Sequence, residues 1–214
     1  MKLLRSFYDR PTLDVARDLL GKVLVHERRG VRTSGAIVEV EAYIGEDDPA
    51  CHAAPGPARR NAPMYGEPGH AYVYLNYGIH WMMNIVTEAK GSPAAVLIRA
   101  LAPIDGLEVM RRRRGAAAGD HELCRGPGNL TKAMRITHTE NATDLLGTRL
   151  YLEDRGLDIE AVEWGPRIGI NVGREQPWRA WVPAHPAVSR GPGRRGARPR
   201  GPFPAGAGAG RRQG

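Results

Sequence analysis

The chain has 214 residues, which is enough for one domain with a substantial core but leaves no room for a second enzyme domain. Its formal net charge is +8, yet residues 190–214 contain seven Arg and no Asp, Glu or Lys; removing these seven from +8 leaves +1 on residues 1–189. The body of the chain is therefore nearly neutral, and its isoelectric point alone is no argument for nucleic-acid binding.

The cysteines and the hydropathy pattern indicate the cellular compartment. Cys51 and Cys124 are the only two cysteines, and no C-x-x-C occurs, which suits a reducing cytoplasm. Their spacing leaves open whether they form a disulfide. No apolar segment of signal-peptide length follows Met1, and no run of about 18 apolar residues occurs. We expect a soluble cytoplasmic protein, located in the bacterial cytoplasm or nucleoid.

The first elements expected are a helix and a strand hairpin. A helical pattern begins at Pro11-Thr12 and ends before Gly21. Residues 23–25 then predict a strand that pairs, through a turn at 28–30, with a strand over 37–44. In the second strand apolar and polar residues alternate, so Glu39, Glu41 and Tyr43 share one face that looks toward solvent or a cleft. A solvated face is the commoner meaning of such a pattern.

The middle of the chain predicts a long loop followed by strands. Residues 45–70 lack periodicity and are rich in Gly, Pro and Ala, and loops of this length tend to be functional or disordered. Strands are expected at 72–75, 79–86 and 95–101, with Tyr77 beside Gly78 at a bend where its ring could project. Arg99 lies inside the apolar run 96–101, where an unpaired guanidinium would be costly to bury.

The last third predicts less regular structure. We expect a helix over 103–114 with Ile104 facing inward, and a short helix after Gly126 that Asn129 caps. Further strands are expected near 149–152, 159–163 and 167–172. From Gly191 onward the composition is almost wholly Gly, Pro, Ala and Arg, which predicts a disordered tail.

Several short motifs in register resemble the alkyladenine, or 3-methyladenine, DNA glycosylase family. The resemblance covers residues 6 to about 189. Its motifs are Val40-Glu41-Ala42-Tyr43, His52, Arg60-Asn61, Tyr72-Val73-Tyr74, Tyr77-Gly78, Met83-Asn84, Leu97-Ile98-Arg99-Ala100-Leu101 and Leu123-Cys124 with Gly126-Pro127. The resemblance implies an α+β fold: a single domain (1–189) with a curved, mostly antiparallel β-sheet flanked by helices, followed by a disordered Gly/Pro/Arg-rich C-terminal tail (190–214).

The resemblance also implies the catalytic pair. Glu41 would be the general base that activates water for attack on the sugar C1′, and its carboxylate would also stabilise an oxocarbenium-like transition state. Arg99 would orient Glu41 and the water. A structural ion pair between Arg99 and another acid, such as Glu39, is the competing interpretation.

Five further residues are expected to bind the DNA by the same resemblance. Tyr43, His52 and Tyr74 would stack on the extruded base, although tyrosines in strands more often pack in a core. Asn84 would read the purine edge and exclude guanine, or else make a strand-edge hydrogen bond. Tyr77 would be the wedge that fills the gap left by the flipped nucleotide.

One position departs from the family pattern, and several kinds of chemistry are not indicated. His80 stands where this family often has an aromatic residue, which leaves the fine specificity of the pocket open. None of the four lysines lies in the motif cluster, which favours water as nucleophile without strand cleavage. No metal-ligand spacing is present, so we expect no metal and no cofactor.

The sequence therefore predicts a monofunctional DNA glycosylase of base excision repair. Its expected partner is double-stranded DNA that contains damaged purines, and it is expected to act as a monomer without a membrane partner. Two alternatives stay open. One is a non-catalytic nucleic-acid-binding protein, for which Glu41 would matter only in folding. The other is a nucleoside or RNA N-glycoside hydrolase, which would need no wedge at Tyr77.

Overall fold

One long strand, β2 (Val31–Ile44), organises the fold. The computed structural model describes residues 1–115 and 118–189. In it β2 pairs with β1 (Val23–Arg28) on one side and with β5 (Ala94–Asp105) on the other, both antiparallel. The predicted pairing of β1 with β2 through the turn at 28–30 is confirmed.

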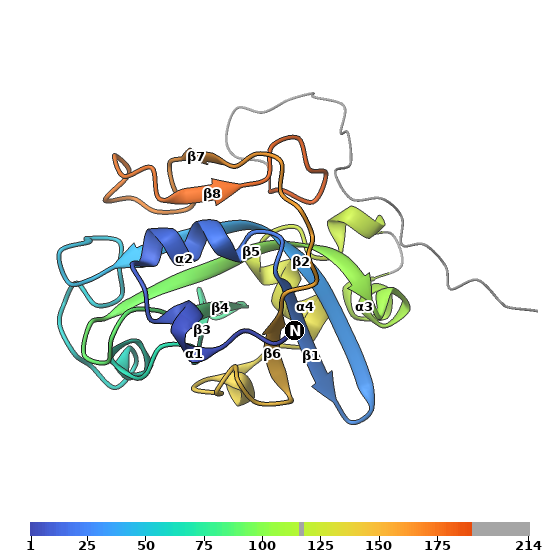
Figure 1. Cartoon of the computed structure of the whole chain (residues 1–214), viewed down its shortest axis with the longest axis horizontal. Helices are drawn as coiled ribbons and strands as arrows, with labels where there is room; N and C mark the ends of the chain where they lie inside the picture. The colour runs from blue at the N-terminus through green and yellow to red at the C-terminus, as the bar shows by residue number, and fades with distance from the viewer. Residues whose placement is uncertain (116–117, 190–214) are drawn as a thin grey trace, which may run out of the picture.

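The remaining strands complete a curved antiparallel sheet whose order is β3-β4-β5-β2-β1-β6 (Figure 1). These strands are β3 (Ala71–Asn76), β4 (His80–Val86), β6 (Leu150–Glu153), β7 (Glu163–Gly165) and β8 (Arg179–Trp181). β8 pairs with β2 at Glu39 to Glu41, where the register between β2 and β5 is interrupted. A third strand thus meets β2 at the residues expected to carry the chemistry.

Four α-helices flank the sheet, as expected for an α+β fold. They are α1 (Arg5–Tyr8), α2 (Thr12–Leu19), α3 (Leu107–Arg114) and α4 (Pro127–Met134), with short 3₁₀ helices η1 (Ala62–Tyr65), η2 (Asp120–Glu122) and η3 (His138–Glu140). α2 packs on β2 and β5, while α4 packs on β4 and β5 and contacts α3. The helix predicted to begin at Pro11-Thr12 is confirmed as α2, and Gly21 beyond it has φ +81°.

The helix expected over 103–114 is shorter than predicted. β5 continues to Asp105, and α3 begins only at Leu107. Gly106 separates them with φ +79°, and a Cβ there would lie 2.5 Å from the carbonyl oxygen of Arg32. Pairing with β2 therefore extends the strand as far as this glycine. Ile104 is 38% exposed and does not face inward.

The expected start of one further helix and two expected strands are also wrong. α4 begins at Pro127, a favoured first helical residue, so Asn129 lies inside the helix and its amide donates to the Arg125 carbonyl at 2.8 Å. The strands expected at 159–163 and 167–172 do not form; β7 begins at Glu163 and 167–172 is a bend. Arg167 is buried there and uses its side chain, not a strand ladder, to hold this segment.

Two further properties of the described residues bear on the expectations. Cys51 and Cys124 are both buried and free of a disulfide. No helix in residues 1–115 and 118–189 is long and apolar enough to cross a membrane. The tail predicted to be disordered lies outside the described residues.

Candidate active site

Glu41 lines a pocket and its side chain is completely buried. The Tyr43 hydroxyl donates to its Oε2 at 2.9 Å, and Arg99 Nη1 lies 3.0 Å from the same oxygen. The backbone N–H of Ile168 donates to Oε1 at 2.7 Å. A carboxylate has about four lone-pair sites, so these three contacts fix the group and leave capacity for one more donor.

Arg99 joins Glu41 to Glu39, and both interpretations of this arginine therefore apply. Its Nε donates to Glu39 Oε1 at 3.0 Å while Nη1 contacts Glu41. Burial alone would lower the pKa of Arg99, but Glu41 and Glu39 together raise it above its ordinary value. A permanently charged guanidinium is thus held beside the pocket carboxylate.

Glu39 does not line the pocket but belongs to the same buried network of ion pairs. Its side chain is fully buried and also accepts from Arg179 Nε at 2.7 Å and from the Ser189 N–H and hydroxyl, both at 2.7 Å. Burial would raise the pKa of Glu39, but Arg99, Arg179 and Ser189 hold it below its ordinary value. Glu39, Glu41, Arg99 and Arg179 together carry two negative and two positive charges, so the buried group is electrically balanced.

Tyr43 forms one wall of the pocket. Its ring lies 4.7 Å from the Arg167 guanidinium, which forms a fully buried ion pair with Asp48 at 2.6 Å. Arg167 also donates to the Ala42 carbonyl at 3.0 Å. Burial, and then the neighbouring Glu41 charge, raise the pKa of Tyr43, which keeps its hydroxyl a hydrogen-bond donor. The Arg167–Asp48 pair thus fixes both the tyrosine and the start of the segment that places the Ile168 N–H.

His52 and Tyr74 form an aromatic pair on the same pocket. Their ring centroids lie 4.3 Å apart at 61°, and His52 Nδ1 lies 2.8 Å from the Tyr72 hydroxyl. Asn61 holds the loop by donating to the His52 carbonyl at 2.8 Å. Burial, and then Arg60, lower the pKa of His52, so the imidazole is neutral at pH 7.

The two remaining expected residues, Asn84 and Tyr77, also line this pocket. Asn84 is buried and donates to the Tyr72 carbonyl at 3.1 Å, so it makes the strand hydrogen bond while facing the cavity. Tyr77 is 81% exposed, with φ +49°, at the tip of the hairpin that joins β3 and β4. His80, in contrast, lies outside the pocket lining and against Gly128 of α4.

The cavity has a volume of about 370 Å³, within the range typical of small-molecule sites. All seven residues expected from the sequence line it, together with Ala50, Met64, Asn76, Met82, Leu97, Pro127, Ile168, Gly169 and Ile170. The structure thus brings a carboxylate, a guanidinium, three aromatic groups and an amide into one pocket, with a projecting tyrosine at its edge. This arrangement can hold a flat heterocycle against apolar and aromatic surfaces above a fixed carboxylate.

The comparisons with known proteins assign this arrangement to a class. Residues 6–186 match the family model for methylpurine-DNA glycosylase. The chain belongs to this family and is a DNA glycosylase, an enzyme that hydrolyses N-glycosyl bonds in DNA.

Named relatives agree over nearly their whole length. A protein of Methanocella arvoryzae is 51% identical over 88% of this chain and 96% of its own. One from Chlorobaculum parvum is 46% identical over 86% and 88%, and one from Alkaliphilus oremlandii is 45% identical over 89% and 100%. Each carries the name "Putative 3-methyladenine DNA glycosylase".

Sequence reasoning misses the groups that support the site from behind. Glu39 enters only as a competing partner of Arg99, while Arg179, Arg167 and Asp48 carry no signal that marks them. Arg167 begins a segment that is wrongly predicted to be a strand, and Arg179 lies in a strand of three residues, which is too short to give a periodic signal. The Ile168 contact comes from the backbone and leaves no side-chain signal in the sequence.

Proposed function

We propose that the protein is a monofunctional glycosylase that removes damaged purines from duplex DNA by hydrolysis. The candidate bases are 3-methyladenine, 7-methylguanine, ethenoadenine and hypoxanthine, of which the first occurs in the names of the relatives. The observation that carries the proposal is Glu41: a fully buried carboxylate that lines the pocket, held by three contacts and with one acceptor position left for a water.

The proposed reaction begins with extrusion of the damaged nucleotide, which costs a few kcal/mol. Stacking of the base on Tyr43, His52 and Tyr74 would offset this cost, because each base–aromatic contact contributes about 1–3 kcal/mol. The projecting Tyr77 would occupy the gap in the duplex and hold the nucleotide outside the stack. Asn84 would contact the edge of the base.

Glu41 would then accept a proton from the water as it attacks C1′. Positive charge develops on the sugar as the base leaves, and the negative carboxylate beneath it lowers the energy of that transition state. Arg99 orients the carboxylate through Oε2 and the Ile168 N–H orients it through Oε1, so little reorganisation is needed during the reaction. The base departs with the electron pair of the N-glycosidic bond, and the sugar gains a hydroxyl.

The exposed Tyr77 favours this reaction over the two alternatives. A free nucleoside offers no base stack, so a hydrolase for nucleosides gains nothing from a ring that projects from a hairpin tip. A binding protein without activity gains nothing from a buried carboxylate that is oriented by three donors. The pocket also holds no lysine, which supports water as the nucleophile and argues against coupled strand cleavage.

The substitution Glu41→Gln tests the proposal. It preserves the shape of the side chain but removes the base, and single-turnover excision should fall at least about a hundredfold while lesion binding persists. Glu108→Gln is the matched control, because the Glu108 side chain is 76% exposed on α3. Near-normal excision by Glu41→Gln would refute the assignment. Excision measured on duplexes that carry each candidate lesion separately would establish the substrate range.

A further inference from the structure

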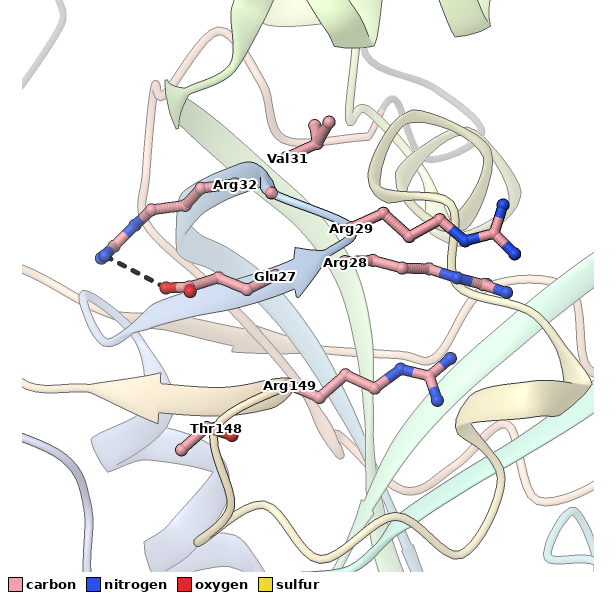
Figure 2. A pocket seen from close by; sticks show the side chains of 8 residues that line it. Glu27, Arg28, Arg29, Val31, Arg32, Thr148 and Arg149 are labelled. Carbon is pink, nitrogen blue, oxygen red and sulfur yellow. Dashed lines mark hydrogen bonds and ion pairs between the residues drawn. The ribbon is translucent and has the colours of Figure 1, made fainter.

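A second pocket surrounds the turn between β1 and β2, at the end of β2 opposite Glu41. It has a volume of about 510 Å³ and is lined by Glu27, Arg28, Arg29, Gly30, Val31, Arg32, Thr148 and Arg149. Figure 2 shows the side chains of Arg28, Arg29 and Arg149 extending to the same side of the turn. Arg32 extends the other way and meets Glu27 at 3.2 Å. One side of the turn is therefore cationic and the other is neutralised.

An adjoining cavity of about 60 Å³ extends the cationic side. It shares Arg28 and Arg29 with the larger pocket and adds Arg113 and Arg135. Burial, and then the like charges of Arg135 and Arg112, lower the pKa of Arg113. The guanidinium groups thus lie close enough to repel one another, and an anion between them would relieve that repulsion.

Two carboxylates, those of Glu27 and Glu140, lie beside this cluster in the described ranges. Glu27 pairs with Arg32 on the other side of the turn, and the bonding of Glu140 is largely satisfied. Glu140 is fully buried, forms an ion pair with Arg149, lies 3.6 Å from Arg28, and accepts from the Thr137 N–H at 2.7 Å. Within residues 1–115 and 118–189, Arg29 and Arg135 form no ion pair. The cluster therefore carries excess positive charge that faces solvent.

The backbone at these two arginines is unusual. Arg29 has φ +51° and, with Gly30 at +73°, occupies the middle of the β1–β2 turn. Arg135 has φ +60° directly after α4. Gly and Asn are the residues favoured at both kinds of position, so each arginine costs conformational free energy there. Residues that are unfavourable for their own backbone conformation often mark functional positions. Arg29 and Arg135 both line the smaller, adjoining cavity.

Helix α4 connects this cluster to the lesion pocket. Pro127 at its first turn lines the lesion pocket, and Met134 at its end lines the adjoining cavity. Eight helical residues span about 12 Å at 1.5 Å each. Along β2 the separation is larger, because the stretch from Glu41 back to Val31 spans about 33 Å at about 3.3 Å per residue. Since phosphates on one DNA strand recur about every 3.4 Å along the helix axis, this distance corresponds to up to about ten base pairs.

We propose that Arg28, Arg29, Arg135 and Arg149 form a binding site for backbone phosphates of the bound duplex, within about ten base pairs of the extruded nucleotide. The inference rests on the proposed function, since it requires a duplex seated with its lesion above Glu41. Guanidinium groups suit this role because they donate two parallel hydrogen bonds to phosphate oxygens and stay charged. The site concentrates positive charge locally on a body whose net charge is nearly neutral.

The double substitution Arg29→Asn with Arg135→Asn tests the site, because Asn suits both backbone positions and should leave the fold intact. Affinity for undamaged duplex should fall roughly tenfold for each phosphate that is no longer bound, and the slope of log affinity against log salt should flatten by up to about 0.9 per phosphate. Arg32→Gln is the matched control: it removes the same charge from the same turn, but from its neutralised side. Its affinity and salt slope should equal those of the wild type.

A second measurement locates the bound phosphates. Duplexes with one neutral methylphosphonate linkage, moved stepwise along each strand, should weaken wild-type binding at a position within about ten base pairs of the lesion, where the double variant is insensitive. Superimposable salt lines for wild type and double variant, or no such position on either strand, would overturn the site. The site would also be refuted if the double variant lost affinity for inorganic phosphate but bound undamaged duplex as tightly as the wild type. Failure of the wild type to excise any lesion would instead refute the proposed function.

Discussion

The two ends of β2 handle charge in opposite ways. Near its C-terminal end, Glu39 and Glu41 are buried against Arg99 and Arg179, and the four charges sum to zero. At its N-terminal end, the arginines around the turn outnumber the two carboxylates beside them, those of Glu27 and Glu140. The first arrangement fixes groups in advance of a reaction, which lowers reorganisation during catalysis. The second leaves charge available for a polyanion, whose counterions are released on binding.

The largest expected effect is on the free energy of unfolding. It tests whether the end of β2 that carries Glu39 and Glu41 depends on its buried ion pairs. Glu39→Gln should leave Arg179 buried without its carboxylate and should lower the free energy of unfolding by about 3–5 kcal/mol, the usual cost of breaking a buried ion pair. Arg32→Gln at the other end should cost at most about 1 kcal/mol, because exposed pairs contribute little. Urea unfolding of both variants measures the contrast. Equal losses of unfolding free energy in Glu39→Gln and Arg32→Gln would show that the buried and the exposed ion pairs contribute alike to stability.

A pH titration sharpens the comparison at the cationic end. Burial would raise the pKa of Glu140, but the neighbouring His26 and hydrogen bonds from Thr137 and Thr139 lower it to about 2. A depressed carboxyl pKa contributes stability above the ordinary value near 4.5, and that stability is lost as pH falls toward about 2. The shift corresponds to about 3 kcal/mol. Unfolding measured from pH 6 to pH 3 should show this loss in the wild type.

The control for that titration is Glu140→Gln. The variant should be less stable at pH 6 and should lose less further stability on acidification, so the two curves should converge as pH falls. Parallel curves would mean that Glu140 contributes no pH-dependent stability, and that the arginines at this end are held by other contacts.

The sequence predicts the lesion pocket better than the boundaries of the elements. The position of Arg99 in an apolar run predicts that it pairs with an anionic group, because a buried guanidinium requires one, and the family resemblance identifies Glu41 as the partner. The side chains of Glu39 and Glu41 prove to be fully buried, since Arg179 of β8, Ser189 after it and the Ile168 N–H contact the two carboxylates. A strand three residues long gives no periodic signal, so this burial could not be predicted.

The cationic cluster illustrates a second limit. Its arginines come from the β1–β2 turn, from α3, from the end of α4 and from the residue before β6, far apart in the sequence. A net charge of about +1 on residues 1–189 conceals them, because acids elsewhere cancel their charge in the sum. Only the fold shows that most of the acidic residues that cancel this charge in the sum lie away from the arginine cluster. The one local sign is arginine beside glycine in a tight turn, which by itself predicts nothing about a partner.

A smaller effect is expected at the edge of the lesion pocket. Tyr77→Ala should weaken excision in duplex DNA by roughly tenfold, because removing one aromatic ring that stacks on the bases costs about 1–3 kcal/mol. Excision from single strands should change less, since there is less stack to hold open. Single-turnover rates on the same lesion in both contexts provide the measurement. Equal losses in the two contexts would indicate a packing role for Tyr77.

The smallest expected effect concerns the Arg-rich residues 191–214, which hold six of the seven arginines that follow residue 189. If they contact phosphates transiently, each neutralised charge steepens the salt dependence of duplex affinity by at most about 0.9. Removing them should weaken non-specific binding and flatten that dependence. Lesion preference should stay fixed, because phosphate contacts position a protein without reading bases.

The truncation also separates two sources of positive charge. Affinity of the full-length and truncated chains for undamaged duplex should be measured across a salt series, each with and without the Arg29→Asn and Arg135→Asn substitutions. Additive changes in slope would mean that the tail and the cluster contact different phosphates. Superimposable lines for the full-length and truncated chains would mean that the tail contributes nothing. The unbalanced end of β2 would then have to supply the electrostatic part of DNA binding, while its balanced end carries out the chemistry.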